Sequence, residues 1–249
     1  GIRDLVRSRG LGDVYKRQIK RLAIRGAPAI GACGAYGVVV AIDQITTNEV
    51  TQVISEMNEA AETIGETRPT AVNLSYAVER VQKTAAEGKS KEEIREFALT
   101  EANKIFTEDR DACDSIGRHG AEEFSSYTNL MTHCNAGALA TVGYGTALGV
   151  IRATKDSGKN VKVIATETRP IQQGSRLTAF ELKHDGIDVS LIPDTAVGYS
   201  MANGLVDKIV VGADRILRTG HVYNKIGTYQ VATTVSYTHL RAHETVLDL

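Results

Sequence analysis

A lone cysteine stands in the segment whose residue types are best suited to chemistry. Residues 130–149 read LMTHCNAGALATVGYGTALG, so two apolar residues lead into His133, Cys134 and Asn135, and four glycines follow. This pattern predicts a short strand, a turn that carries Cys134, and a helix packed close to its neighbour. Ligands of open α/β sheets bind where the carboxyl ends of strands meet helix N-termini. By itself, however, such a cysteine is more often a small buried core residue.

Two arginines stand just before segments that contain a proline and continue as predicted helices. The first is Arg25 in the sequence RGAP, and the second is Arg68 in RPTAV. A proline is tolerated in the first turn of a helix, and a helix N-terminus with a nearby arginine is suited to bind an anion. Each motif alone would more often mark a solvated surface arginine. Together, the two motifs predict two donors to one anion.

The elements that must position these residues fall into two expected domains. Residues 19–126 contain a Gly- and Ala-rich helix and two further helical stretches at 46–64 and 90–120, which predicts a mostly helical first domain. From residue 127 strands and helices alternate. The expected strands are 129–133, 161–167, 187–192 and 208–212, and the expected helices are 136–155, 176–183 and 196–203. This alternation predicts an α/β fold with a Rossmann-like, doubly wound parallel sheet.

A parallel sheet brings the loops that follow its strands to one edge. The polar residues expected to gather there are Cys134, Glu167, Gln173, Asp194 and Asp214. The Gly-Tyr-Gly at 143–145 is expected inside a helix, and no GxGxxG follows a strand, so no dinucleotide site is predicted.

Composition narrows the class of protein. The chain has 249 residues, a formal net charge of −1 and 42% hydrophobic residues, which is typical of a globular protein and gives no basic patch for nucleic acid. Three cysteines without a CxxC or a His/Cys cluster indicate reduced thiols in a cytoplasmic protein and no metal site. The longest apolar run, 27–42, is too short and too rich in Gly and Ala to span a bilayer, and no signal peptide is visible.

Both ends of the chain differ in character from the rest. Residues 1–18 and 235–249 resemble translated sequencing-adaptor read-through, so we expect a non-native leader and a non-native tail. The helical domain is then expected at 19–126 and the Rossmann-like domain at 127–234. We expect the second domain to be truncated at its C-terminus.

Six motifs stand together in order along residues 19–233: IRGAPAIG, RPTAVNL, THCNAGALAT, ETRP with its QG and RLTA continuation, VGADRI and NKIGTY. This set closely resembles the 5-methylthioribose-1-phosphate isomerase family of methionine salvage. The wider family contains ribose-1,5-bisphosphate isomerases and regulatory subunits of a eukaryotic translation-initiation exchange factor. The proline of RGAP and the Asn-Ala-Gly after the cysteine favour the methylthioribose enzymes.

The resemblance implies a role for each matching residue. Its catalytic pair, the cysteine of HCN and the aspartate of GADR, matches Cys134 and Asp214. The substrate-binding positions of the family match Arg25, Gly26, Ala27, Arg68, Gln173, Asn224 and Lys225.

The implied reaction converts 5-methylthioribose 1-phosphate into 5-methylthioribulose 1-phosphate without a cofactor. Asp214 is expected to act as an acid/base if a water-poor pocket raises its pKa. Cys134 would move a proton or stabilise developing charge, and Arg25, Arg68 and Lys225 would bind the phosphate. Two alternatives stay open: a ribose-1,5-bisphosphate isomerase, and a non-catalytic sugar-phosphate-sensing regulatory homologue. The resemblance also implies a homodimer.

Overall fold

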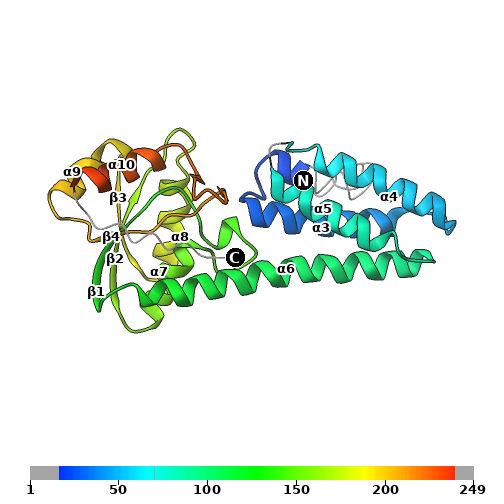
Figure 1. The fold of residues 1–249 in the computed structure, drawn as a ribbon, viewed down its shortest axis with the longest axis horizontal. Coiled ribbons are helices and arrows are strands. Elements are labelled where there is room, and N and C mark those ends of the chain that lie inside the picture. The colour runs from blue at the N-terminus through cyan, green and yellow to red at the C-terminus, as the bar shows by residue number, and fades with distance from the viewer. Residues whose placement is uncertain (1–16, 70, 239–249) are drawn as a thin grey trace. The chain divides into compact units, whose positions relative to one another are not determined.

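The computed structural model describes residues 17–69 and 71–238 (Figure 1). Most of the expected leader, and residues 239–249 of the expected tail, lie outside the described residues. The chain forms two compact units. The first contains the described residues up to Asp111 together with Ala140–Val142, and the second contains Ala112–Leu139 and the described residues from Gly143 onward. The division lies inside a long helix, whereas the sequence suggested residue 126.

The first unit is built from helices around one apolar core. Its helices are α3 (Ala27–Gln44), α4 (Val50–Gly65), α5 (Val72–Ala85) and the first part of α6 (Lys91–Glu122). Two glycines let α3 approach α5 closely. A Cβ atom at Gly34 would lie 2.4 Å from Cδ1 of Leu74, and one at Gly31 would lie 3.0 Å from the carbonyl oxygen of Asn73. This close approach is what the Gly- and Ala-rich sequence predicted.

Helix α3 is also long and apolar enough to cross a membrane, judged by length and composition alone. However, 61% of its 18 residues are buried, and they contribute to the apolar core of the first unit. Burial of this kind is typical of the central helix of a globular core.

The two helix starts predicted from prolines differ in outcome. Pro28 does lie in the first turn of α3, after the N-cap residue Gly26. The second prediction was wrong, because α5 begins at Val72. Pro69 instead lies in a turn closed by a 2.9 Å hydrogen bond from the Ala71 amide to the Arg68 carbonyl.

The second unit contains the expected parallel sheet. Its strands are β1 (Tyr127–Thr132), β2 (Asn160–Thr166), β3 (Asp188–Ile192) and β4 (Lys208–Ile209), in the order β3-β2-β1-β4. All three strand pairs are parallel. The chain builds outward from β1 to β3 and then crosses to place β4 on the other side of β1. This doubly wound order confirms the predicted α/β class and puts the topological switch point between β1 and β4.

Helices cover both faces of this sheet (Figure 1). Leu130 and Val163 pack against α7 (Ala147–Asp156) and α8 (Ala179–His184) on one face. Met131 and Ile164, one position further along each strand, pack on the other face. That face is covered by α9 (Val197–Ala202) and α10 (Thr228–Thr238). The alternation follows from the two-residue period of a strand.

The helix expected at 136–155 begins eleven residues later, so this prediction was wrong. Residues 133–146 form a loop with one 3-10 turn, η1 (Ala138–Ala140). The Ala136 carbonyl closes the loop by accepting from the amides of Thr146 (3.0 Å) and Leu148 (3.2 Å). Gly145 has φ +87°, which a helix does not permit. The Gly-Tyr-Gly at 143–145 therefore lies in a loop.

At the other end of the second unit, α10 continues across the expected boundary at residue 235. Val235 is half-buried and packs against the cluster that contains Met131 and Val197. The first four residues of the expected tail are thus part of a packed helix.

Candidate active site

Cys134 lies two residues after the end of β1, in a strained backbone conformation. Its φ of +69° is in the left-handed region, which costs a non-glycine residue about 1–3 kcal/mol and persists only where the surroundings impose it. Two threonines hold it from both sides. The Cys134 amide donates to Oγ1 of Thr168 (2.9 Å), and Oγ1 of Thr178 donates to the Cys134 carbonyl (2.6 Å). These bonds fix the half-buried side chain at the carboxyl end of the strand.

The thiol of Cys134 has a side-chain partner. Nε2 of Gln173 lies 3.5 Å from Sγ and donates to it. Gln173 is only 3% exposed, and its buried Oε1 has no hydrogen-bond partner among the residues that the structure describes. A buried acceptor without a donor is uncommon in a folded protein. The structure thus brings together two predicted site residues, and leaves one acceptor there unused.

The glycine after this glutamine is required by space. A Cβ atom at Gly174 would lie 1.8 Å from the carbonyl oxygen of Thr166. Since no other residue type fits, the Gln-Gly pair allows η2 (Gly174–Thr178) to pass close to β2 and to direct Gln173 toward the cysteine. The Gln-Gly motif was visible in the sequence, but the need for glycine follows from the close approach of residue 174 to β2 in the folded protein.

The loop after β2 is held by the carboxylates predicted at this edge. Asp194 accepts from the amides of Thr168 (2.8 Å) and Arg169 (2.7 Å), and Glu167 lies 3.3 Å from Nε of Arg169. Thr168 itself has a left-handed φ of +61°. Glu167 and Asp194 therefore shape the loop that in turn positions Cys134.

His133 links the cysteine loop to the last predicted motif. The ring is 2% exposed, with Nε2 2.8 Å from the carbonyl of Ile226 and Nδ1 2.7 Å from Oγ1 of Thr166. A carbonyl can only accept, so Nε2 carries a proton and donates to Ile226, while Nδ1 shares a hydrogen bond with the Thr166 hydroxyl. The segment that contains Asn224 and Lys225 is thereby tied to the residue next to Cys134. Gly227 permits the contact, since a Cβ there would lie 2.7 Å from Cε1 of the ring.

Asp214 comes after β4, the neighbour of β1, and precedes the hairpin of β5 (Arg215–Ile216) and β6 (Val222–Tyr223). Its amide donates to the Tyr223 carbonyl (2.8 Å). A Cβ at Gly212 would lie 2.7 Å from Cβ of Ala136, so the chain before Asp214 packs on the cysteine loop. The side chain of Asp214 is exposed, whereas the sequence suggested a water-poor pocket.

The other binding positions are divided between the units. In the second unit, Nδ2 of Asn224 donates to Oγ1 of Thr228 (3.1 Å), and Lys225 is half-buried. The first unit holds Arg25, Gly26, Ala27 and Arg68. Gly26 has φ +86°, and a Cβ there would lie 2.1 Å from the carbonyl oxygen of Ala140, so only glycine fits. The convergence of Arg25, Arg68 and Lys225 on one anion stays a prediction.

Sequence reasoning missed a buried acidic residue next to the site. Glu181 is 5% exposed and pairs with Nη2 of Arg152 at 2.8 Å. Burial works to lower the pKa of Arg152, but hydrogen bonds to Glu181 and Asp185 outweigh it and the pKa is raised. The available signal was an acidic residue placed between two large apolar residues, Phe180 and Leu182.

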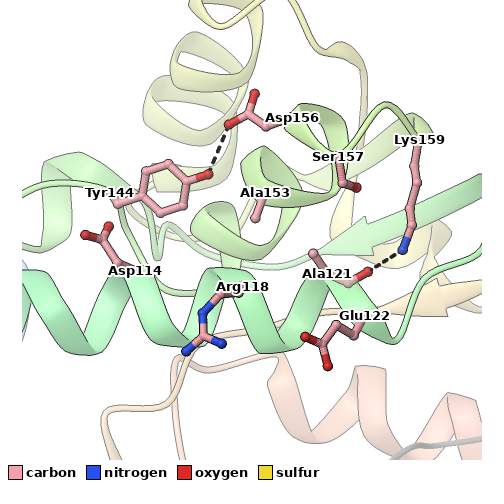
Figure 2. Close-up of a pocket in the computed structure, with 9 residues that line it drawn as sticks. All are labelled: Asp114, Arg118, Ala121, Glu122, Tyr144, Ala153, Asp156, Ser157 and Lys159. Carbon is pink, nitrogen blue, oxygen red and sulfur yellow. Dashed lines mark hydrogen bonds between the residues drawn. The ribbon is translucent and has the colours of Figure 1, made fainter.

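A surface groove of about 470 Å³ lies elsewhere in the second unit (Figure 2). Tyr144 and Asp156, joined by a 3.2 Å hydrogen bond, line it together with Lys159, which donates to the Ala121 carbonyl (2.7 Å). Lys159 directly precedes β2, so this groove is at the amino edge of the sheet, opposite to Cys134. None of the predicted site residues line it. Within residues 17–69 and 71–238 no cluster of three or more His, Cys, Asp or Glu is suited to a metal ion.

Comparison with known proteins identifies a family and relatives within it. The model of the initiation factor 2 subunit family matches residues 23–240. A methylthioribose-1-phosphate isomerase from Carboxydothermus hydrogenoformans is 52% identical over 86% of this chain and 62% of its own length. The crystal structure of 5-methylthioribose 1-phosphate isomerase from Pyrococcus horikoshii matches with a TM-score of 0.87 at 39% identity, over 92% of this chain and 65% of that one.

A second solved structure carries a different description. The translation initiation factor eIF-2B subunit delta from A. fulgidus matches with a TM-score of 0.84 at 47% identity, over 92% of this chain and 67% of that one. The chain spans 62–64% of the length of the first three curated relatives that it matches.

Proposed function

Because this chain belongs to the initiation factor 2 subunit family, we propose that its protein is a 5-methylthioribose-1-phosphate isomerase. The proposed reaction converts the aldose 1-phosphate into 5-methylthioribulose 1-phosphate. The observation that carries the proposal is the 52% identity to a relative with that name. It is supported by the position of Cys134, at the carboxyl end of the central strand with the Gln173 amide on its sulfur.

The chemistry of the proposed substrate explains the demands on the site. C1 carries the phosphate, so the ring must open while the phosphate stays attached, and hydrogen must then move from C2 to C1. Asp214 would transfer a proton, and Cys134 would transfer a second proton or stabilise the charge that develops. Asp214 is exposed in this chain, so its work as an acid/base requires that the bound substrate or a further element exclude water around it.

The binding residues fit a phosphorylated polyol. Arg25, Arg68 and Lys225 supply the positive charge that a phosphate dianion needs. Gln173 offers a buried acceptor, Oε1, that has no donor within residues 17–69 and 71–238, and a sugar hydroxyl is a donor of the required kind. We assign Gly26, Ala27 and Asn224 to the same substrate on the basis of the family motifs.

The proposal includes the setting of the protein. Its three cysteines are free thiols, as in proteins of a reducing compartment, which supports a cytoplasmic location. We also propose a homodimer, on the basis of the family resemblance alone.

The proposed function is tested by turnover on two sugar phosphates. The purified protein is incubated with 5-methylthioribose 1-phosphate and, separately, with ribose 1,5-bisphosphate, and ketose formation is followed by NMR. We expect turnover of the first and at most slow turnover of the second. The reverse preference would establish a bisphosphate isomerase. Binding of either sugar phosphate without turnover would instead favour a regulatory homologue, the class suggested by the initiation-factor structure.

A further inference from the structure

The carboxylate of Glu181 accepts hydrogen bonds from the segment that directly follows Cys134. Oε1 accepts from Nδ2 of Asn135 (2.9 Å) and, at longer range, from the amide of Leu139 (3.4 Å). Oε2 accepts from the amide of Ala138 (2.8 Å). Three donors between residues 135 and 139 thus meet one buried carboxylate on α8.

Arg152 fixes that carboxylate in turn. Its guanidinium donates to three acceptors: Oε2 of Glu181 (2.8 Å), Oδ2 of Asp185 (2.7 Å) and the carbonyl of Tyr144 (2.6 Å). Two of these acceptors are on or beside α8, and the third is near the end of the cysteine loop. Arg152 therefore clamps the carboxylate between α7 and the loop, and leaves it little freedom to rotate.

The loop is fitted closely around Glu181. A Cβ atom at Gly137 would lie 2.3 Å from Oε2 and 2.5 Å from Oε1 of the carboxylate. A glycine at this position is therefore needed to let the backbone reach the acid. The close fit means that a small displacement of the carboxylate is passed to the loop.

The loop also carries one of two unusual buried atoms. Among the described residues, the buried side-chain polar atoms without a hydrogen-bond partner are Oδ1 of Asn135 and Oε1 of Gln173. Asn135 adjoins Cys134 in the chain, and Gln173 donates to its sulfur. Unsatisfied acceptors are costly in a fold, and their concentration on both sides of one thiol indicates an arrangement held for function.

We propose that Glu181, clamped by Arg152, is a positioning residue that sets the geometry of the Cys134 loop for the reaction. It acts through Asn135 and the amides of the loop and does not itself touch the substrate. The inference rests on the proposed function for its role in turnover, but the geometric part stands by itself.

Another ion pair in the chain provides a matched control. Glu101 in the first unit has a side chain that is 13% exposed, and it accepts from Nε of Arg80 (2.8 Å). Both Glu101 and Arg80 are on helices, so this pair joins two packed elements and holds no loop. Glu101→Asp and Glu181→Asp make the same chemical change, which keeps the charge and shortens the reach of the carboxylate by one methylene.

The first measurement is the alkylation of Cys134 by iodoacetamide, resolved by mass spectrometry of its peptide. The rate is taken on the plateau of the pH profile, where it reports access and orientation of the thiol and no longer its ionisation. We expect Glu181→Asp to raise the plateau rate by about threefold or more, since the loop opens locally. Glu101→Asp should leave it unchanged. Equal rates in wild type and Glu181→Asp, with the variant folded by circular dichroism, would overturn the inference.

A second variant keeps the test decisive if Glu181→Asp does not fold. Asn135→Ala removes one donor and leaves the Glu181–Arg152 pair intact, so we expect a change in the same direction but smaller. An unchanged plateau rate in this variant would also count against the proposal.

The kinetic measurement separates positioning from general destabilisation. For 5-methylthioribose 1-phosphate we expect Glu181→Asp to lower kcat by about tenfold while KM changes by less than about twofold, because a small misplacement of a reacting group mainly costs rate. Loss of kcat in Glu101→Asp to the same degree would assign the effect to stability. If the wild type turns over neither sugar phosphate, the proposed function fails, and the alkylation rates still decide whether Glu181 positions the thiol.

Discussion

The interiors of the two units differ in the kind of residue they bury. In the first unit the core is apolar, and Thr141 is the single buried polar residue among those that the structure describes there. In the second unit, strands β1 and β2, the loops that follow them and the neighbouring helical segments bury a histidine, two amides, several threonines and an acid. Buried polar groups are stable only when they are paired, and pairing fixes direction as well as position. The first unit is thus stabilised mainly by apolar packing, whereas hydrogen bonds in the second unit fix the positions and directions of individual polar groups.

The same contrast appears in the two arginine clusters. Arg80 pairs with Glu101 and Glu108 where the side chains are 13–48% exposed, and water weakens such pairs. Arg152 pairs with Glu181 where the side chains are 12% and 5% exposed. A buried pair gives little net stability compared with apolar packing, but it strongly disfavours any other arrangement. The buried Arg152–Glu181 pair therefore fixes the positions of its side chains more strictly than the more exposed pairs of Arg80 do.

The largest effect should come from a break in the apolar core of the first unit. Leu74→Ala removes a fully buried side chain that packs on Gly34, and we expect a loss of about 2–5 kcal/mol in the free energy of unfolding. Val72→Ala, on the same helix but 53% exposed, should change it by less than about 0.5 kcal/mol. Urea unfolding measures both. Similar losses in the two variants would contradict the account of this core.

The second unit should respond to small changes at the candidate catalytic pair. We expect Cys134→Ser and Asp214→Asn each to lower kcat by about 10²-fold or more, the scale of a positioned acid/base, while the fold is kept. Cys33→Ala, in the core of the first unit, serves as the control for loss of a thiol and should retain turnover. Near-wild-type rates in Asp214→Asn would end the proposed mechanism.

A pH titration tests the burial of the Cys33 thiol in the core of the first unit. Burial raises the pKa of Cys33 from 9.0 to about 11, so the folded state keeps its proton where the unfolded chain loses it. This contribution to stability is complete below pH 9 and is lost as the pH rises to about 11. It amounts to about 2–3 kcal/mol at most. Unfolding of wild type and Cys33→Ala between pH 8 and 11 should show a steeper decline for the wild type; parallel curves would exclude the effect.

The smallest effect compares two fully buried threonines. Oγ1 of Thr178 donates to the Cys134 carbonyl, whereas Oγ1 of Thr154 donates to the Val150 carbonyl one helical turn earlier. Thr178→Val should cost about 1–2 kcal/mol of unfolding free energy and alter Cys134 alkylation. Thr154→Val should cost less and leave alkylation unchanged, because its acceptor already lies in a helix. A larger loss of unfolding free energy in Thr154→Val than in Thr178→Val would show that the bond to the Cys134 loop contributes no more than a bond within a helix.

Local patterns in the sequence predicted much of the fold and failed at specific loops. The parallel sheet followed from four apolar segments separated by helices, and α3 followed from Gly26 and Pro28. The helix was expected to begin at residue 136 because Ala138, Leu139 and Ala140 have good helix propensity, but it begins at Ala147. Their amides and those nearby instead find partners far away in the sequence, such as the Glu181 carboxylate, and these outweigh local preference.

By itself, the sequence determined the α/β class and the polar residues that follow each strand. It also determined the motifs that mark Cys134, Gln173 and Asp214. These features depend on residue types and their spacing along the chain. The tertiary structure alone decided which groups meet the thiol. The bond from Gln173 to Sγ and the four donors around Glu181 join residues 29 to 46 positions apart. No local pattern encodes such pairings. They arise because adjacent parallel strands end at one edge, where glycines such as Gly174 leave room for the backbone to come close.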